Sequence, residues 1–322
     1  MIRFASVLTL SLALSLAPAA LADERQGTPK GAKVKIELKH VNGNKAHVNS
    51  KILGIGYVRP FVPRQRVKVW VARAAKKVTV KRQVIKQVPG KNQGTFQIRS
   101  DRLLEDGTYR VRARKKNSPE QKAFHAESRG IGIRYPDLDP GMKSNDVELF
   151  NDLLQKEGYY TSNGRSYDAG TERAVLAYRK VNGMERIYNA TPDMFKKLAS
   201  GKGGYDLRYP GKGKHVETDL SRQVMVLANH GKPQHTFHIS SGTRATPTIQ
   251  GHHVFTRKQY GTNSNGMVHS VYFGPTNRGY ATHGYKSVPN FPASHGCLRN
   301  PIPNSLFIYN WISLGDDIYV YP

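Results

Sequence analysis

Cysteine is nearly absent from this chain: Cys297 is the only one among 322 residues. A single cysteine excludes a disulfide within the chain. The residue lies in the polar, glycine-bearing segment ATHGYKSVPNFPASHGCLRN, residues 281–300, which reads as a loop and not as a core strand. The position of this single thiol in a polar loop, after His283 and His295, therefore calls for a functional or structural reason.

Acidic residues are also scarce, with 23 Asp and Glu against 50 Lys and Arg, and the formal net charge is +27. The surplus is uneven, because residues 23–134 hold 28 basic against 8 acidic residues and residues 135–322 hold 21 against 15. Such a block attracts polyanions, for which we expect anionic wall polymers or lipid headgroups and no nucleic acid. The alternative is a basic surface that only keeps the protein soluble.

Long apolar runs are missing after the first residues. The run from Phe4 to Leu21 follows a short positive start and ends in Ala20-Leu21-Ala22, a pattern that signal peptidase cuts. We expect a signal peptide at residues 1–22 and an exported protein, in the periplasm or in the cell wall and extracellular space. A membrane anchor is the alternative interpretation of this run.

Residues 23–135 have the pattern of strands. Val67, Val69 and Val71 alternate with polar residues, and similar runs are separated by glycine, asparagine and proline turns. Period-two alternation indicates strands with one buried and one wet face. We predict a basic, β-sandwich-like domain that serves as a spacer or an adhesive surface.

Residues 136–203 change to helical spacing. Val147, Phe150 and Leu154 share one face of a helix that we expect Asn145 to cap, and Thr191 followed by proline predicts the start of another. Three short helices predict a small three-helix bundle. The segments LDPGMKSNDVELFNDLLQKEGYY, DAGTERAVLAYRKVNGM and TPDMFKKL resemble the peptidoglycan-binding domain of wall enzymes. A purely structural spacer is the alternative.

Residues 214–322 return to strands, with one helix expected in NSLFIYNWISLG and a closing strand in DDIYVYP. The predicted fold class is multidomain and mainly β, with a β-sandwich-like N-terminal domain, a small three-helix bundle and a β-rich C-terminal domain.

The lone thiol fits nucleophilic catalysis. A thiolate is the reactive form, and a nearby imidazole can take its proton. We expect His283 to be this base. His295 is on the same tight turn as Cys297, where its ring can point away from the sulfur, whereas a loop can bring His283 back from an adjacent strand. Gly296 would allow a sharp turn on which the amides of His295, Gly296 and Cys297 stabilise an oxyanion. Gly284, just after the base, would let a backbone carbonyl approach the imidazole and fix its tautomer.

Two other interpretations stay open at this point. Cys297 would be an inert buried thiol if the segment were part of the core. Alternatively, His283, His295 and Cys297 would bind a catalytic zinc ion, although the sequence lacks the usual close pair of ligands.

The segment SHGCLRN, preceded by HG at residues 283–284, resembles the active-site signature of the L,D-transpeptidases, the YkuD-like catalytic domain. The resemblance extends over residues 214–322. It implies that Cys297 attacks a peptidoglycan tetrapeptide stem, that His283 moves the proton, and that a second stem amine resolves the thioester. It implies no metal and no organic cofactor, and it makes carbapenem-type β-lactams expected covalent inhibitors.

The resemblance also suggests supporting residues. The orienting backbone would come from Gly284, Ser294, His295 and Gly296, and stem contacts from Arg299, Asn300, Met267 and Tyr272; Arg299 and Asn300 would alternatively brace the loop. An L,D-carboxypeptidase, in which water resolves the same acyl-enzyme, is a second hypothesis. A non-catalytic wall-binding protein is a third.

Overall fold

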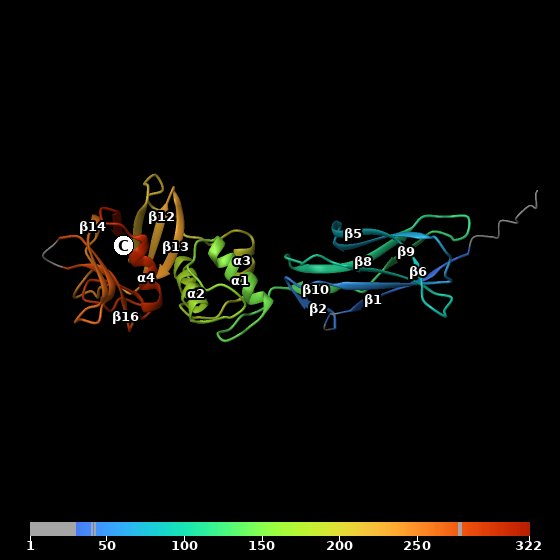
Figure 1. Cartoon of the computed structure of the whole chain (residues 1–322), viewed down its shortest axis with the longest axis horizontal. Coiled ribbons are helices and arrows are strands. Elements are labelled where there is room, and N and C mark those ends of the chain that lie inside the picture. Colours follow the sequence, from blue (N-terminus) through green and yellow to red (C-terminus); the bar gives the residue numbers. More distant parts are fainter. Residues whose placement is uncertain (1–29, 40, 42, 276–278) are drawn as a thin grey trace, which may run out of the picture.

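The computed structural model describes residues 30–39, 41, 43–275 and 279–322. The predicted signal peptide lies outside the described residues. A β-sandwich, three helices and a large β-sheet with one helix follow one another along an elongated molecule (Figure 1). The predicted mainly β fold class is confirmed. Within the part of the chain that the structure describes, no helix has the length and apolarity needed to cross a membrane.

The sandwich consists of two sheets whose inner faces share one core. One sheet has the order β1-β3-β7-β6 and the other the order β2-β10-β8-β4-β5, with β9 paired to β8. Val67, Val69 and Val71 of β4 are buried, as their alternation predicts. A Cβ atom on Gly54 would lie 2.9 Å from the Val111 side chain, so glycine allows the sheets to approach closely at this point. The strands are β1 (Lys33–Lys39), β2 (Lys45–His47), β3 (Leu53–Arg59), β4 (Arg66–Arg73), β5 (Lys76–Val84), β6 (Lys86–Gln87), β7 (Gly94–Arg99), β8 (Gly107–Lys115), β9 (Phe124–Glu127) and β10 (Ile131–Arg134).

The helical segment contains α1 (Asn145–Lys156), α2 (Ala169–Val181) and α3 (Pro192–Ala199). The predicted apolar face of α1 is buried. Its cap differs from the prediction: Ser144 is the N-cap, because its Oγ accepts from the Val147 amide, and Asn145 is already inside the helix. Thr191 caps α3 with proline next to it, as predicted.

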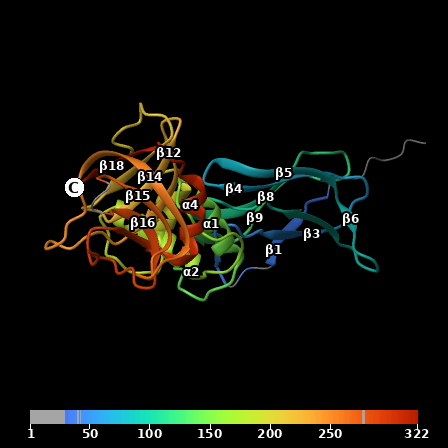
Figure 2. The ribbon, with the colours of Figure 1, turned by 60° about the vertical axis from the view of Figure 1, so that its left-hand side comes forward.

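The C-terminal sheet has the order β13-β12-β11-β18-β14-β15-β16-β17. The closing strand β18 lies in the middle of this sheet, parallel to β11 and antiparallel to β14. Figure 2 shows β14, β15 and β16 side by side, and the helix α4 packs against β15, β16 and β17. The elements are β11 (His215–Asp219), β12 (Val224–Asn229), β13 (Lys232–His238), β14 (Gly251–Thr262), β15 (Val268–Phe273), β16 (Ala281–Tyr285), β17 (Leu298–Pro301), α4 (Ile302–Trp311) and β18 (Asp317–Tyr321).

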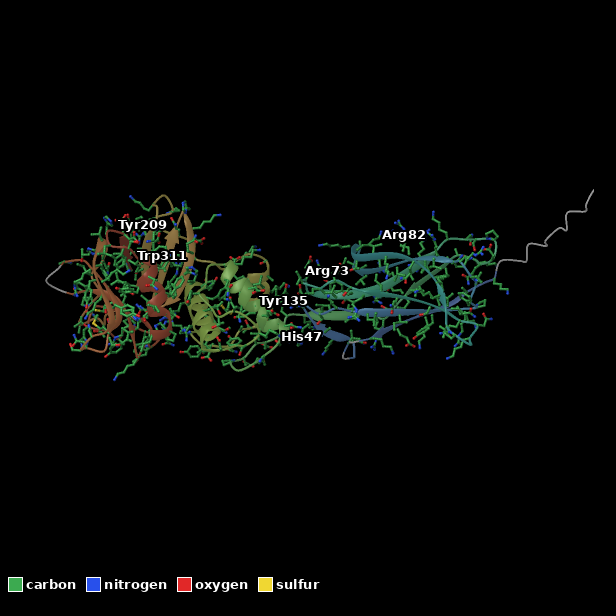
Figure 3. The ribbon with its side chains drawn as sticks, viewed as in Figure 1. His47, Arg73, Arg82, Tyr135, Tyr209 and Trp311 are labelled. Atoms are coloured by element: carbon green, nitrogen blue, oxygen red, sulfur yellow. The ribbon has the colours of Figure 1, made fainter. Side chains whose placement is uncertain are left out.

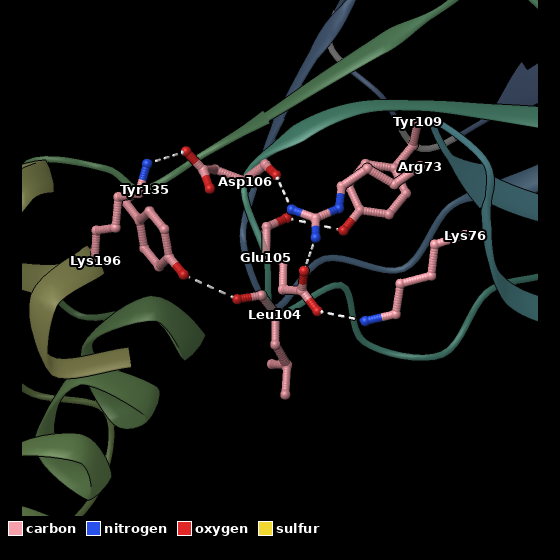
Figure 4. Close-up of polar contacts among 8 residues, drawn as sticks. All are labelled: Arg73, Lys76, Leu104, Glu105, Asp106, Tyr109, Tyr135 and Lys196. Atoms are coloured by element: carbon pink, nitrogen blue, oxygen red, sulfur yellow. Dashed lines mark hydrogen bonds and ion pairs between the residues drawn. The ribbon is translucent and has the colours of Figure 1, made fainter. Parts of the chain in front are cut away.

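The sandwich and the helical segment are joined by specific contacts (Figure 4). The Tyr135 hydroxyl donates to the Leu104 carbonyl at 3.0 Å, and its ring packs 5.1 Å from that of Phe195 on α3. Lys196 Nζ lies 2.9 Å from the Asp106 carboxylate. One hydrophobic cluster runs through both parts, so the connection is a packed junction and not a bare linker.

Candidate active site

The candidate base lies on one of two neighbouring parallel strands, and the candidate nucleophile directly precedes the other. His283 is in β16, and its register partner in β17 is Arg299. Cys297 comes immediately before β17, two residues before Arg299. Arg299, two residues after Cys297, lies beside His283, and the Cys297 thiol has a backbone hydrogen bond to Ala281, two residues before His283. The fold therefore places the thiol beside the strand that carries His283, 14 positions away in the sequence.

The thiol is partly buried and protonated at rest. Cys297 Sγ donates a hydrogen bond to the Gly279 carbonyl, 3.8 Å away. Burial raises the pKa of Cys297, and this effect is opposed by a backbone hydrogen bond at Ala281 and by the charge of Arg299. Burial also lowers the pKa of His283, which is only 3% exposed. At neutral pH the pair is therefore a thiol and a neutral imidazole, so the imidazole must act as a general base.

The tautomer of His283 follows from its hydrogen bond. Nδ1 lies 2.9 Å from the Gly284 carbonyl oxygen. A carbonyl oxygen only accepts, so Nδ1 carries the hydrogen and Nε2 keeps the lone pair that can take a proton. The ring of Tyr285 packs edge-on against the imidazole, with centroids 5.7 Å apart. A backbone carbonyl thus orients the base without a carboxylate.

Gly284 is also required by the helix behind it. A Cβ atom there would lie 2.7 Å from Ser305 Cβ and 3.2 Å from the backbone of Ile302, both in α4. The residue therefore allows α4 to pack closely on the strand that carries His283, on the face opposite the imidazole. This packing role was not part of the sequence interpretation.

Ser294 organises the turn before the thiol. Its side chain is buried, and Oγ donates to the Cys297 carbonyl at 2.5 Å and accepts from the Gly296 amide at 3.1 Å. The Gly296 amide therefore already donates to Ser294, which corrects the expectation that it would stabilise an oxyanion. The other two amides expected to do so are those of His295 and Cys297. Gly296 has φ +113°, and a Cβ atom would lie 2.9 Å from the Tyr280 ring. Only glycine fits this position without strain.

The two residues after the thiol differ in their surroundings. Arg299 is partly exposed, and its guanidinium carbon lies 4.3 Å from the centroid of the Tyr285 ring. Asn300 is fully buried, and its amide nitrogen donates to Thr282 Oγ1 at 3.2 Å. Of the two roles predicted for Asn300, its contacts fit the bracing of the loop and not a contact with substrate.

Tyr272 lies on the same side of the sheet as His283. Its register partner on β16 is Ala281, two residues before His283. Sequence reasoning missed Arg257, whose guanidinium carbon lies 3.5 Å from the Tyr272 ring centroid. Arg257 is the register partner of Tyr272 because the register of β14 shifts just before Arg257. No local sequence pattern predicts such a shift. Met267 precedes β15 and is partly buried, with its amide bound to a side chain of the same turn.

The helical segment supports the loop that leads to Cys297. Lys180 of α2 reaches His238 of β13, with Nζ 2.7 Å from Nδ1, and His238 Nε2 donates to the Val288 carbonyl at 3.0 Å. Arg186 donates to the Asn290 carbonyl, and the Asn290 side chain donates back to the Arg186 carbonyl at 3.2 Å. Sequence reasoning missed these residues as well, because the partners are separated by 50 to 104 positions.

The zinc alternative requires three converging ligands. His283 is buried, whereas the His295 side chain is exposed at the turn. Among the described residues, no group of three His, Cys, Asp or Glu side chains is arranged to hold a metal ion.

Comparisons with known proteins bear on the C-terminal sheet. Residues 213–320 match the family model described as the L,D-transpeptidase catalytic domain, YkuD. An L,D-transpeptidase from Xylanimonas cellulosilytica is similar in structure, with 28% identity and a TM-score of 0.52 over 58% of this chain and 98% of that chain. No curated protein matches the chain in a sequence search.

Two further structures are less similar. An L,D-transpeptidase from Stackebrandtia nassauensis has 18% identity and a TM-score of 0.34 over 57% of this chain and 94% of that chain. An L,D-transpeptidase solved in complex with imipenem has 11% identity and a TM-score of 0.30 over 90% of this chain and 99% of that chain.

The family match and the Xylanimonas structure define the class of this part of the protein, an acyltransferase domain of the L,D-transpeptidase type. Residues 213–320 belong to the YkuD family of L,D-transpeptidase catalytic domains.

Proposed function

We propose that the protein is a peptidoglycan L,D-transpeptidase with Cys297 as its nucleophile and His283 as its base. One observation carries the proposal: within an L,D-transpeptidase domain, the Cys297 thiol contacts the backbone at the start of β16, the strand that carries a neutral imidazole with its Nδ1 fixed. The neutral Nε2 is suited to accept the thiol proton, since the imidazole needs no prior deprotonation.

In the proposed reaction, Cys297 Sγ attacks the carbonyl that joins the third residue of a tetrapeptide stem to D-Ala. The thiol proton passes to Nε2 of His283, and the carbonyl oxygen becomes an oxyanion. The amides of His295 and Cys297 would hold this oxyanion, at about 3–4 kcal/mol for each donor. The C–N bond then breaks, and the imidazolium protonates the leaving amine of D-Ala.

A second stem then completes the transfer. Its side-chain amine attacks the thioester, its proton goes to His283, and Cys297 leaves as a thiol once it regains a proton. The product is a cross-link between the third residues of two stems. Arg299 and Arg257 hold guanidinium groups over the rings of Tyr285 and Tyr272, and we assign these groups to the carboxylates of the stems, because guanidinium binds carboxylates in a bidentate manner.

Product analysis tests the reaction. The protein is incubated with purified disaccharide-tetrapeptides, and the products are weighed by mass spectrometry. We expect cross-linked dimers from the wild type and none from Cys297→Ala. Tripeptides without dimers would replace the proposal by the L,D-carboxypeptidase, in which water resolves the thioester. Turnover that survives in Cys297→Ala would overturn the thiol mechanism, and turnover lost with a chelator would favour zinc.

A carbapenem is the second probe of the same thiol. Its strained amide resembles an activated acyl donor, so the proposed nucleophile should open the ring and remain acylated. We expect a single adduct on the peptide that contains Cys297, with none after alkylation of the thiol. An adduct on a different residue would contradict the assignment.

The proposal includes export to the periplasm or cell wall and attachment to the wall through residues 23–203. The basic composition of residues 23–134 and the peptidoglycan-binding resemblance of the helical segment support it. Attachment is tested with Cys297→Ala protein and isolated sacculi in a sedimentation assay, where binding without turnover is expected. A protein that stays in the supernatant would rule out the attachment role.

A further inference from the structure

The outer face of the sandwich carries a row of cations across three strands. Inward-pointing valines alternate with outward-pointing residues in β4, so Lys68 points away from the core. Its register partners are Arg82 on β5 and Arg114 on β8. Neighbouring strands lie about 4.8 Å apart, so the three cationic side chains project side by side. Figure 3 shows Arg82 on the outer side of the sandwich.

This row is electrostatically unfavourable by itself. Like charges directly opposite one another destabilise a sheet. The pKa of Lys68 is lowered, first by the charge of nearby Lys77 and then by desolvation. The charges of Arg82 and Arg114 lower it further. The free protein therefore carries a repulsion that a bound anion would relieve.

Carboxylates neutralise the neighbouring cations but not this row. In the adjacent row of cross-strand partners, Arg112 of β8 forms an ion pair with Glu127 of β9, with Nε and the carboxylate 2.5 Å apart. Among the ion pairs of the described residues, none includes Lys68, Arg82 or Arg114. The cations in the row are thus available to an external anion.

The row borders an open groove of about 1130 Å³ that extends toward one end of the sandwich. Among its lining residues, Glu120 is the only acidic one. The cationic residues that line the groove are Arg64, Arg66, Lys68, Arg82, Arg114, Lys116 and the buried Lys115. A chain-like anion could follow these charges over several residues, whereas a single small anion would use only a few of them.

An aromatic ring lies beside the row. Trp70 of β4 is partly exposed, and the Nζ atoms of Lys68 and Lys77 lie 6.0 Å and 5.8 Å from its ring. Val80, directly opposite Trp70 on β5, is 47% exposed, and Val84, opposite Arg66, is 44% exposed. The face therefore offers exposed apolar side chains on both sides of the cationic row.

We propose that this face binds an anionic polysaccharide, with a sugar ring on Trp70 and the phosphate or carboxylate groups of the polymer on Lys68, Arg82 and Arg114. A flat aromatic ring suits the apolar face of a pyranose, and repeated anionic groups suit a row of fixed cations. The inference rests on the wall attachment included in the proposed function, and it assigns that attachment to one face of the sandwich.

The test uses full-length Cys297→Ala protein and polygalacturonate, which has one carboxylate on each sugar, with neutral dextran as the uncharged counterpart. Binding is measured by titration calorimetry at two salt concentrations. We expect affinity for polygalacturonate, weakening with salt, and none for dextran. Replacing Lys68, Arg82 and Arg114 by Gln should lower the affinity about tenfold or more, and Trp70→Ala about threefold.

A matched triple variant removes the same charge elsewhere. Lys33, Lys86 and Lys91 are exposed and lie on or beside the other sheet, and their replacement by Gln should change the affinity less than twofold, roughly the effect of net charge alone. Equal losses in the two triple variants would overturn the site. So would the absence of polygalacturonate binding by the parent protein.

Two further probes separate the partner classes. Tighter binding to phosphatidylglycerol vesicles or to double-stranded DNA than to polygalacturonate would overturn the polysaccharide assignment. Melting curves show whether Trp70→Ala is folded. If this variant is unfolded, the two triple charge variants still test the site. Because the binding assay contains no stem peptide and measures no turnover, its result and the outcome of the turnover assay are independent of each other.

Discussion

Lys180 Nζ lies 2.7 Å from His238 Nδ1 and 3.1 Å from each of the carbonyl oxygens of Gln223 and Ile239. Three acceptors surround the Lys180 nitrogen, and burial lowers the pKa of Lys180 to about 6. His238 in turn donates from Nε2 to the Val288 carbonyl. A helix of the helical segment is thereby connected to the loop that leads to the candidate nucleophile.

Lys180→Met should loosen this connection. The substitution keeps the length of the side chain but leaves His238 Nδ1 and two carbonyls without their donor, at a cost of about 1–3 kcal/mol in the free energy of unfolding. The loop before Cys297 loses its support, so acylation of Cys297 by a carbapenem should slow about tenfold. Calorimetry and adduct formation over time measure the two effects.

Lys196→Met is the matched control, because Lys196 pairs with Asp106 at the opposite, sandwich side of the helical segment. It should leave acylation unchanged and cost less than about 1 kcal/mol, as exposed ion pairs do. Equal acylation rates in Lys180→Met and wild type would contradict the supporting role.

His238 predicts how stability depends on pH. Burial, followed by the charge of Lys180, lowers the pKa of His238 to about 3. The nearby Arg186 and Arg173 lower it as well, and the Val288 hydrogen bond raises it. The unfolded chain binds this proton below about pH 6.5, whereas the folded chain does not. The contribution of His238 to stability should therefore be complete above pH 6.5 and decline steadily as the pH falls toward 3.

Melting temperatures between pH 4 and pH 8 measure this dependence. His238→Asn, whose side-chain oxygen can still accept from Lys180, should flatten the acid side of the profile. His230→Asn changes an exposed histidine at φ +51°, a conformation that asparagine tolerates, and should keep the wild-type profile. Identical profiles for the two variants would show that another group controls the acid sensitivity.

The base role of His283 predicts a distinctive rate profile. Because the pKa of His283 is lowered, wild-type acylation should persist at pH values below 6.5. His283→Gln should slow acylation about 10²–10⁴-fold at neutral pH. The remaining rate should rise with pH to beyond pH 9, because the raised pKa of Cys297 delays formation of the thiolate. Adduct formation with a carbapenem, followed over pH, distinguishes the two profiles; a parallel rise in the wild type would exclude His283 as base.

Gly284→Ala should be destabilising by about 1–3 kcal/mol, because the new methyl group collides with Ser305 and the helix must shift. Gly211→Ala is the control, since nothing lies within 4 Å of its Cβ position. Denaturant midpoints of both variants check the prediction. A Gly284→Ala protein as stable as the control would mean that α4 can move without cost.

Much of the fold could be predicted from local patterns. The alternating valines of β4 and the cap at Thr191 depend on neighbours in the chain, and the structure has both. The start of α1 was placed one residue late, because Ser144 and Asn145 are both good caps and only the backbone conformation selects between them.

The candidate site likewise has features that the sequence predicted and features that only the structure shows. The residue types around Cys297 and His283 indicated the chemistry, since a lone thiol near imidazoles and glycines has few other uses in a polar loop. The occupation of the Gly296 amide by Ser294 and the burial of Asn300 depend on how the loop folds back on itself. Arg257 reached Tyr272 only through a register shift, which a sequence does not display.

The sequence alone determined which reactive and charged side chains this protein has and the periodicity of its strands and helices. Both depend only on the identity of residues that are close together in the chain. Only the tertiary structure decided that Lys180 of a distant helix meets His238, and that Lys68, Arg82 and Arg114 align across three strands. These contacts depend on strand register and on the packing of parts far apart in the chain, which no local pattern specifies.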